Sequence, residues 1–120
     1  SADAFSDRFL VANYCPLVFM EASGRNRTPD KLSAAEREPL FAVCDEALRR
    51  LVAWCRPARV IGVGGFAAAR ARGALGADGP PVGSILHPSP ASPAANRGWV
   101  EQMERQLVAH GIPLPQRGPA

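Results

Sequence analysis

Hydrophobic positions along the chain follow two patterns, short apolar runs and stretches of helical spacing. The short runs predict three buried strands, at residues 9–13, 59–62 and 81–87. The helical spacing predicts three helices, at residues 34–55, 66–75 and 94–110. Strands and helices therefore alternate along the chain. This order predicts an α/β fold in which a short parallel sheet carries helices on its faces.

Several residues predict where these elements begin and end. Ser33 stands three residues before Glu36, the spacing of a capping box, so the long helix should begin just after Ser33. Pro39 lies in its first turns and is expected to kink it or delay its start. Gly111 is expected to close the last helix, with residues 113–120 as a frayed tail. The turn-rich residues 20–32 predict a loop.

The composition excludes few classes of protein. The 120 residues suffice for one domain or part of one, and the net charge of +3 permits an anionic partner without requiring it. The three cysteines show no CxxC spacing, which disfavours a disulfide framework or a zinc site. No apolar run approaches the roughly 20 residues that span a bilayer, and no secretion signal is visible. We therefore expect no membrane partner and an intracellular location, cytoplasmic in a bacterium and nuclear in a eukaryote.

Polar and glycine residues end all three predicted strands. Asn13 ends the first, the glycine turn at 62–65 follows the second, and His87 ends the third. Ligands of parallel sheets bind at the carboxyl ends of the strands. We therefore expect Asn13, the glycine turn and His87 to meet at one edge of the sheet.

The glycine turn is open to three interpretations. The stretch GVGGFA matches the dinucleotide fingerprint G-x-G-x-x-A between a strand and a helix. That motif also needs an acidic residue at the end of the next strand, where this chain has His87. The amides of Gly64 and Gly65 could instead contact a phosphate of an oligonucleotide. A purely structural turn is the third interpretation.

Asn13 and His87 each allow a structural and a functional interpretation. An asparagine can simply terminate a strand, but its amide also offers a donor and an acceptor that match the N–H and C=O edge of a pyrimidine base. A lone histidine is usually a packed residue. Here, however, the following HPSP stretch stiffens the backbone, as suits a loop that presses on a partner. His110 is expected to serve only the end of its helix, and Trp54 and Trp99 to be packing residues.

Four stretches of the chain together resemble the single-strand-selective monofunctional uracil-DNA glycosylases of the uracil-DNA glycosylase superfamily. They are VANYCPLVF, SGRNRTP, GVGGFAAARARGAL and HPSPASPAANRGW. The resemblance covers nearly the whole chain. It implies a three-layer α/β/α fold with a short parallel sheet that lacks the first, central strand of the family fold. Residues 1–120 would then be the C-terminal half of the family domain.

The resemblance also implies roles for individual residues. His87 matches the catalytic histidine that stabilises the departing uracil anion, and Asn13 matches the asparagine that recognises the flipped base. Gly64 and Gly65 become phosphate contacts. The loop after His87 matches the DNA-binding wedge that fills the space left by the flipped base. Its residues are Pro88, Ser89, Pro90, Ala91, Ser92, Pro93 and Asn96.

The chain departs from the family pattern in two ways. Family members usually carry an arginine in the wedge where this chain has Ala91, and an arginine is common where it has Gly65. Because of Ala91, insertion into a duplex is expected to be weaker, or the substrate more strictly single-stranded. In addition, the resemblance places the water-positioning asparagine and the aromatic residue that stacks on the base in the absent N-terminal half.

The expected function is hydrolytic removal of uracil from DNA by base flipping, which leaves an abasic site. Removal of oxidised uracils, and activity of these 120 residues alone, are left open. The chemistry needs no metal and no cofactor. The expected partners are single-stranded and double-stranded DNA containing uracil, and the absent N-terminal half. Two alternatives stay open: a nucleotide- or dinucleotide-binding α/β module that uses GVGGFA, and a catalytically dead DNA-binding fragment.

Overall fold

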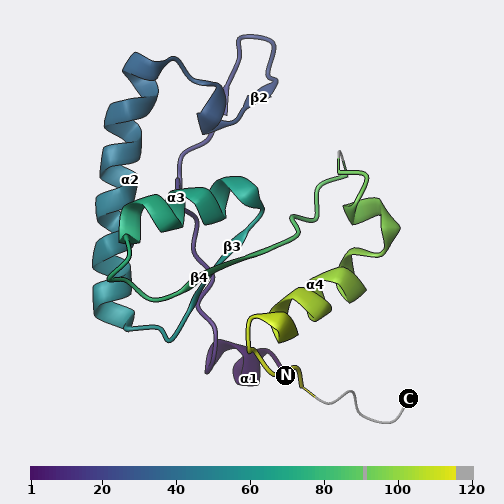
Figure 1. The fold of residues 1–120 in the computed structure, drawn as a ribbon. Coiled ribbons are helices and arrows are strands. Elements are labelled where there is room, and N and C mark those ends of the chain that lie inside the picture. Colours follow the sequence, from purple (N-terminus) through teal and green to yellow (C-terminus); the bar gives the residue numbers. More distant parts are fainter. Residues whose placement is uncertain (91, 116–120) are drawn as a thin grey trace. The chain divides into compact units, whose positions relative to one another are not determined.

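The computed structural model describes residues 1–90 and 92–115 (Figure 1). The chain divides into two compact units, residues 1–46 and 47–120, and each is treated by itself below. The first unit holds α1 (Ala2–Ser6), β1 (Phe19–Met20), β2 (Asn26–Arg27) and a 3-10 turn (Pro29–Lys31). The second holds β3 (Val60–Val63), α3 (Gly65–Leu75), β4 (Val82–Ile85), a 3-10 turn (Ala95–Arg97) and α4 (Trp99–Ala109). Helix α2 (Ala34–Cys55) contributes residues to both.

The second unit is built on a parallel pair of strands, as the sequence predicted. β3 and β4 pair from Val60 opposite Val82 to Val63 opposite Ile85. β3 has β-branched residues at three of its four positions and β4 at two of four, and such residues favour the extended backbone. The β3–α3–β4 order of the prediction is therefore confirmed, with α3 as the crossover helix (Figure 1).

The two faces of this sheet carry different helices. A Cβ at Gly62 would lie 2.3 Å from the backbone nitrogen of Ala68, so one face of the sheet packs directly on α3. A Cβ at Gly83 would lie 2.7 Å from the ring of His110, which follows α4. Gly83 pairs with Ile61, the neighbour of Gly62 in β3, and neighbouring residues of a strand face opposite sides. Helices therefore cover both faces, which confirms the α/β/α layering.

Helix α3 approaches the sheet closely because its inner face consists of alanines. Ala68, Ala71 and Ala74 recur every three residues and are buried, with Ala68 completely inaccessible. The end of α3 is fixed from α2, where the Arg49 guanidinium donates a hydrogen bond to the Ala74 carbonyl at 3.2 Å. Such a contact satisfies a carbonyl that the helix itself leaves without a partner.

The predicted helix at 94–110 forms as two pieces. A 3-10 turn covers Ala95–Arg97, and α4 begins only at Trp99. Between them Gly98 has φ 93° and ψ 73°, a left-handed backbone that interrupts a helix and favours glycine. The prediction was therefore wrong at its start, whereas Gly111, with φ 78°, ends α4 as expected.

The predicted strand at residues 9–13 does not form. The helix α1 precedes these residues, and Leu10 and Val11 are 65% and 78% exposed. A strand needs a partner for its amides and carbonyls. In the part of the chain that the structure describes, β3 and β4 pair only with each other, and β1 pairs only with β2. Without a neighbouring strand, this apolar run therefore forms no β-strand.

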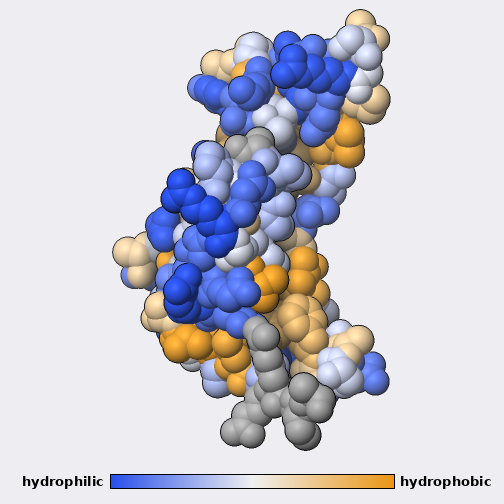
Figure 2. Space-filling view, turned by 90° about the vertical axis from the view of Figure 1, so that its right-hand side faces the viewer, coloured by the Kyte–Doolittle hydropathy of each residue, from blue (hydrophilic) through white to orange (hydrophobic). Residues whose placement is uncertain are grey.

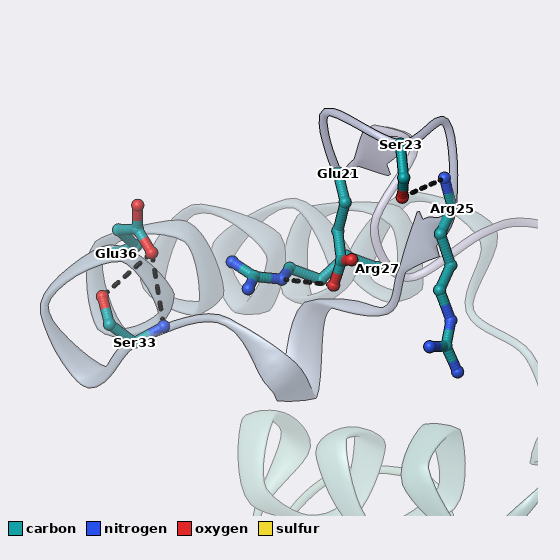
Figure 3. Close-up of polar contacts among 6 residues, drawn as sticks. All are labelled: Glu21, Ser23, Arg25, Arg27, Ser33 and Glu36. Carbon is teal, nitrogen blue, oxygen red and sulfur yellow. Dashed lines mark hydrogen bonds and ion pairs between the residues drawn. The ribbon is translucent and has the colours of Figure 1, made fainter.

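The turn-rich residues 20–32 form more structure than the predicted loop. β1 and β2 make a two-residue antiparallel pair, and the Arg27 guanidinium lies 3.6 Å from the Glu21 carboxylate (Figure 3). The start of α2 is confirmed: the Glu36 carboxylate accepts hydrogen bonds from the Ser33 amide at 3.3 Å and from the Ser33 hydroxyl at 2.9 Å. Pro39 does not delay that start.

Many apolar side chains of the described residues remain exposed. Figure 2 shows such side chains, in orange, among the hydrophilic blue ones on the face that it presents. Trp54 is 81% exposed, so its prediction as a packing residue was wrong. Among the helices of residues 1–90 and 92–115, none is long and apolar enough to cross a membrane.

Candidate functional site

The carboxyl ends of β3 and β4 form an open pocket of about 480 Å³ in the second unit. Its lining includes the glycine turn at Gly64 and Gly65, together with His87 and Ser92 of the loop after β4. A Cβ at Gly64 would lie 3.2 Å from the His87 Cβ, so the turn and the histidine are in close contact. The predicted meeting of the glycine turn and His87 at one sheet edge is thus confirmed.

His87 lies two residues beyond the end of β4 and is exposed. Its imidazole therefore stands at the rim of the pocket rather than in the core. A histidine at such a position can donate a hydrogen bond to a ligand while its backbone stays attached to the sheet. The structural interpretation of His87 as a packed core residue does not fit this exposure.

The loop after His87 is held by its own polar groups. The Ser92 amide donates to the Ser89 carbonyl at 3.0 Å, and the Asn96 side-chain amide donates to the Pro90 carbonyl at 3.1 Å. The Ser92 hydroxyl in turn accepts a hydrogen bond from the Ala95 amide at 3.4 Å. These bonds make the loop a folded unit. Ala91, predicted as part of the wedge, lies outside the described residues.

Side chains of α4 bind the backbone on both sides of this loop. The Trp99 indole donates to the Leu86 carbonyl at 2.5 Å, and the Gln106 side-chain oxygen accepts from the Leu86 amide at 2.7 Å. The Gln102 side-chain amide donates to the Ala94 carbonyl at 2.8 Å. Gln102 and Gln106 were not predicted from the sequence, and Trp99 was predicted as a packing residue. Trp99, Gln102 and Gln106 follow one another at intervals of three and four residues on one helix face, and this spacing was the available signal.

Asn13 belongs to the first unit and is described there. It is exposed, and the next residue anchors its segment to α2. The Tyr14 hydroxyl donates a hydrogen bond to the Asp45 carboxylate and lies 3.3 Å from the Phe41 carbonyl. The Tyr14 ring also packs edge-on against Phe41, with centroids 5.9 Å apart. This anchor fixes Tyr14 without strand pairing and leaves the Asn13 amide accessible.

We expect Tyr14→Phe to lower the free energy of unfolding by about 1–2 kcal/mol, because it removes a hydrogen bond to a carboxylate while keeping the ring contact. Urea unfolding followed by circular dichroism measures this change. Val43→Thr, at an exposed position of the same helix, is the matched control. Equal unfolding midpoints for Tyr14→Phe and the unsubstituted chain would show that the phenol does not anchor this segment.

The glycine turn has a structural use that bears on its predicted ligands. The Gly64 amide donates to the Ile85 carbonyl at 2.8 Å, so it already has a partner inside the fold. A dinucleotide fingerprint depends on these amides and on an acidic residue after the next strand, where this chain has Leu86 and His87. The dinucleotide alternative is therefore disfavoured. Within residues 1–90 and 92–115, no three His, Cys, Asp or Glu side chains gather as a metal site requires.

Comparison with known proteins gives a consistent result. No protein-family model matches the chain. It is 46% identical over 104 residues to the single-strand selective monofunctional uracil-DNA glycosylase of Rattus norvegicus. The matched region covers 85% of this chain and 37% of that relative. The corresponding protein of Bos taurus is 44% identical over 112 residues, or 92% of this chain and 41% of the relative.

The similarity extends over most of the chain, including both units. The chain itself spans about two fifths of the length of these curated relatives. The identity is high, and the structure has the parallel sheet and helical layers that the resemblance implied. The chain therefore belongs to the single-strand-selective monofunctional uracil-DNA glycosylase family.

Proposed function

We propose that this chain is part of an enzyme that removes uracil from DNA by hydrolysis of the N-glycosidic bond. The target nucleotide turns out of the base stack, and the reaction leaves an abasic site. One observation supports the proposal above the others: His87 stands at the rim of a pocket at the carboxyl end of the sheet, beside the glycine turn. Family membership supplies the substrate class.

His87 stabilises the departing base in this proposal. Negative charge develops on uracil as the glycosidic bond breaks, and a fixed N–H donor lowers the energy of that state more than that of the substrate. The imidazole of His87 is accessible for this contact, because the side chain is exposed. The proposed chemistry requires neither a metal nor a cofactor, since uracil leaves with the electron pair and water supplies the incoming oxygen.

The loop after His87 contacts the DNA around the flipped nucleotide. Its three prolines and internal hydrogen bonds reduce the entropy that would be lost when it presses on a partner. The proposed wedge comprises Pro88, Ser89, Pro90, Ala91, Ser92, Pro93 and Asn96. Of the two proposed phosphate contacts, Gly65 opens α3, where backbone amides favour an anion, while the Gly64 amide is used in the fold.

Asn13 recognises the uracil edge in this proposal. We expect Asn13→Ala to lower kcat/KM for uracil excision by about 5- to 150-fold, since a bidentate amide–base pair is worth roughly 1–3 kcal/mol. Excision from a single-stranded uracil oligonucleotide measures the loss. Asn26→Ala, an exposed asparagine in β2, is the control and should retain full activity. Equal activities for both variants would exclude Asn13 from base recognition.

A further segment has to supply the group that positions the attacking water. The curated relatives are about two and a half times as long as the matched part, and the apolar side chains of Leu10 and Val11, near Asn13, are exposed. Both observations support a segment outside these 120 residues that covers this region. The proposed partners are therefore uracil-containing DNA and such a segment.

The proposal is tested by uracil release from a single-stranded oligonucleotide, with the chain alone and with the N-terminal part of the Rattus norvegicus relative added or fused. Release that depends on His87 supports the proposal, and release only in the fused form locates the water-positioning group in the added part. DNA binding without release in either form would contradict it and favour a catalytically dead DNA-binding fragment.

A further inference from the structure

The backbone that carries His87 extends beyond the sheet. The β3–β4 ladder ends at Val63 and Ile85, so Leu86 has no place in it. Both backbone groups of Leu86 are nevertheless bonded, the carbonyl by the Trp99 indole at 2.5 Å and the amide by the Gln106 side chain at 2.7 Å. Two side chains of α4 therefore replace the missing strand neighbour at the residue directly before His87.

These two hydrogen bonds fix the direction in which His87 leaves the sheet. A peptide unit is planar, so the Leu86 carbonyl lies in one plane with the nitrogen and Cα of His87. The indole of Trp99 holds that plane through the carbonyl. Gln106 holds the preceding plane through the Leu86 amide. With two consecutive planes fixed, little backbone freedom remains between the sheet and the Cα of His87.

The same helix face holds the far end of the loop. Gln102 lies between Trp99 and Gln106 at helical spacing, and its side-chain amide donates to the carbonyls of Ala94 and Gly98 at 2.8 and 3.3 Å. The left-handed backbone of Gly98 ends the preceding turn and starts α4 in a new direction. One face of α4 thus binds the loop where it begins, at Leu86, and where it ends, at Ala94.

We infer that the side chains of Trp99, Gln102 and Gln106, here called the α4 clamp, are positioning residues that set the place of His87 for catalysis. This inference rests on the proposed function, because the position of His87 matters only if His87 acts on a substrate. The α4 clamp itself touches no substrate. Its contribution is preorganisation, and a displacement of about 1 Å can cost on the order of 100-fold in rate.

The test compares two disrupting variants with a conservative one in the excision assay. Gln106→Leu removes the acceptor and Trp99→Phe removes the donor, while both keep most of the side-chain volume. Each is expected to lower kcat by roughly 10- to 100-fold with little change in KM. Gln106→Glu keeps an accepting oxygen and should restore most of the rate. Val108→Thr, at an exposed position of α4, is the control.

A double-substitution experiment distinguishes positioning from general stability. In a His87→Ala background, the α4 clamp substitutions are expected to change the residual rate by less than roughly twofold, because residues that act as one unit are not additive. An equal fall in rate with and without His87 would overturn the inference.

Amide hydrogen exchange provides a readout that does not depend on activity. Exchange of the Leu86 amide should become at least about 10-fold faster in Gln106→Leu than in Val108→Thr, and the His87 ring signals should shift only in the former. Unchanged exchange and unchanged ring signals in Gln106→Leu would overturn the inference that the α4 clamp positions His87. Absence of uracil release in both the isolated and the fused form would instead contradict the proposed function. This exchange measurement would still decide whether the α4 clamp holds the loop.

Discussion

Gly62→Ala is expected to lower the free energy of unfolding by about 3 kcal/mol, a large share of the stability of a small domain. A Cβ at Gly62 would lie 2.3 Å from the backbone nitrogen and 2.5 Å from the Cα of Ala68. The obstacle is helix backbone rather than a movable side chain, so α3 as a whole would have to shift away from the sheet. Urea unfolding monitored by circular dichroism measures the loss.

Gly73→Ala provides the matched control in the same unit. Gly73 lies in the exposed part of α3, and no atom lies within 4 Å of a Cβ built there. An alanine in an exposed helix interior should stabilise the chain by about 0.5–1 kcal/mol relative to glycine. If Gly62→Ala unfolds at the same urea concentration as the unsubstituted chain, the close packing of α3 on β3 is wrong.

The parallel sheet and its crossover helix could be predicted because their signals are local. The β-branched residues of β3 and β4, the glycine turn and the alanine-rich helix are each decided within a few neighbouring residues. Ser33 and Glu36 likewise fix the start of α2 across a single turn. Where local preference and final packing agree, hydrophobic spacing alone predicts the element.

Residues 9–13 could not be predicted because a strand is not a local structure. Their apolar run is as strand-like as that of β3, but β3 has β4 beside it. In the described part of the chain the run at 9–13 has no strand partner. The residue that follows it, Tyr14, is anchored to α2 by its side chain instead. The pairing of a strand depends on residues far away in the sequence, and periodicity carries no information about them.

In the candidate site, too, some residues could be predicted from the sequence and others could not. His87 and the glycine turn could be predicted, because the carboxyl ends of neighbouring parallel strands lie at one edge of a sheet. The α4 clamp was missed since Trp99 and Gln106 bind backbone groups of Leu86. A hydrogen bond to a backbone group leaves no signal in the identity of the residue that receives it. The helical spacing of Trp99, Gln102 and Gln106 was the available signal. Gly98, whose left-handed backbone separates α4 from the preceding turn, was a second local indication.

His87→Ala is expected to lower kcat for uracil excision by about 100- to 1,000-fold, the usual cost of removing one donor to a developing negative charge. The assay is release from a single-stranded oligonucleotide, with the relative's N-terminal part fused. The free energy of unfolding should change by less than about 0.5 kcal/mol, because the side chain is exposed at the pocket rim.

His110→Ala should give the opposite pattern and serves as the control. His110 Nε2 lies 3.0 Å from the Ser84 carbonyl, and the ring occupies the space that a side chain at Gly83 would need. Its loss should destabilise the contact between α4 and the sheet by about 1–2 kcal/mol, while the folded fraction keeps its kcat. A parallel fall in rate for both histidine variants, in proportion to their unfolding, would mean that His87 acts on stability and not on the departing uracil. Separate effects would assign the chemistry to the exposed histidine and the packing to the half-buried one.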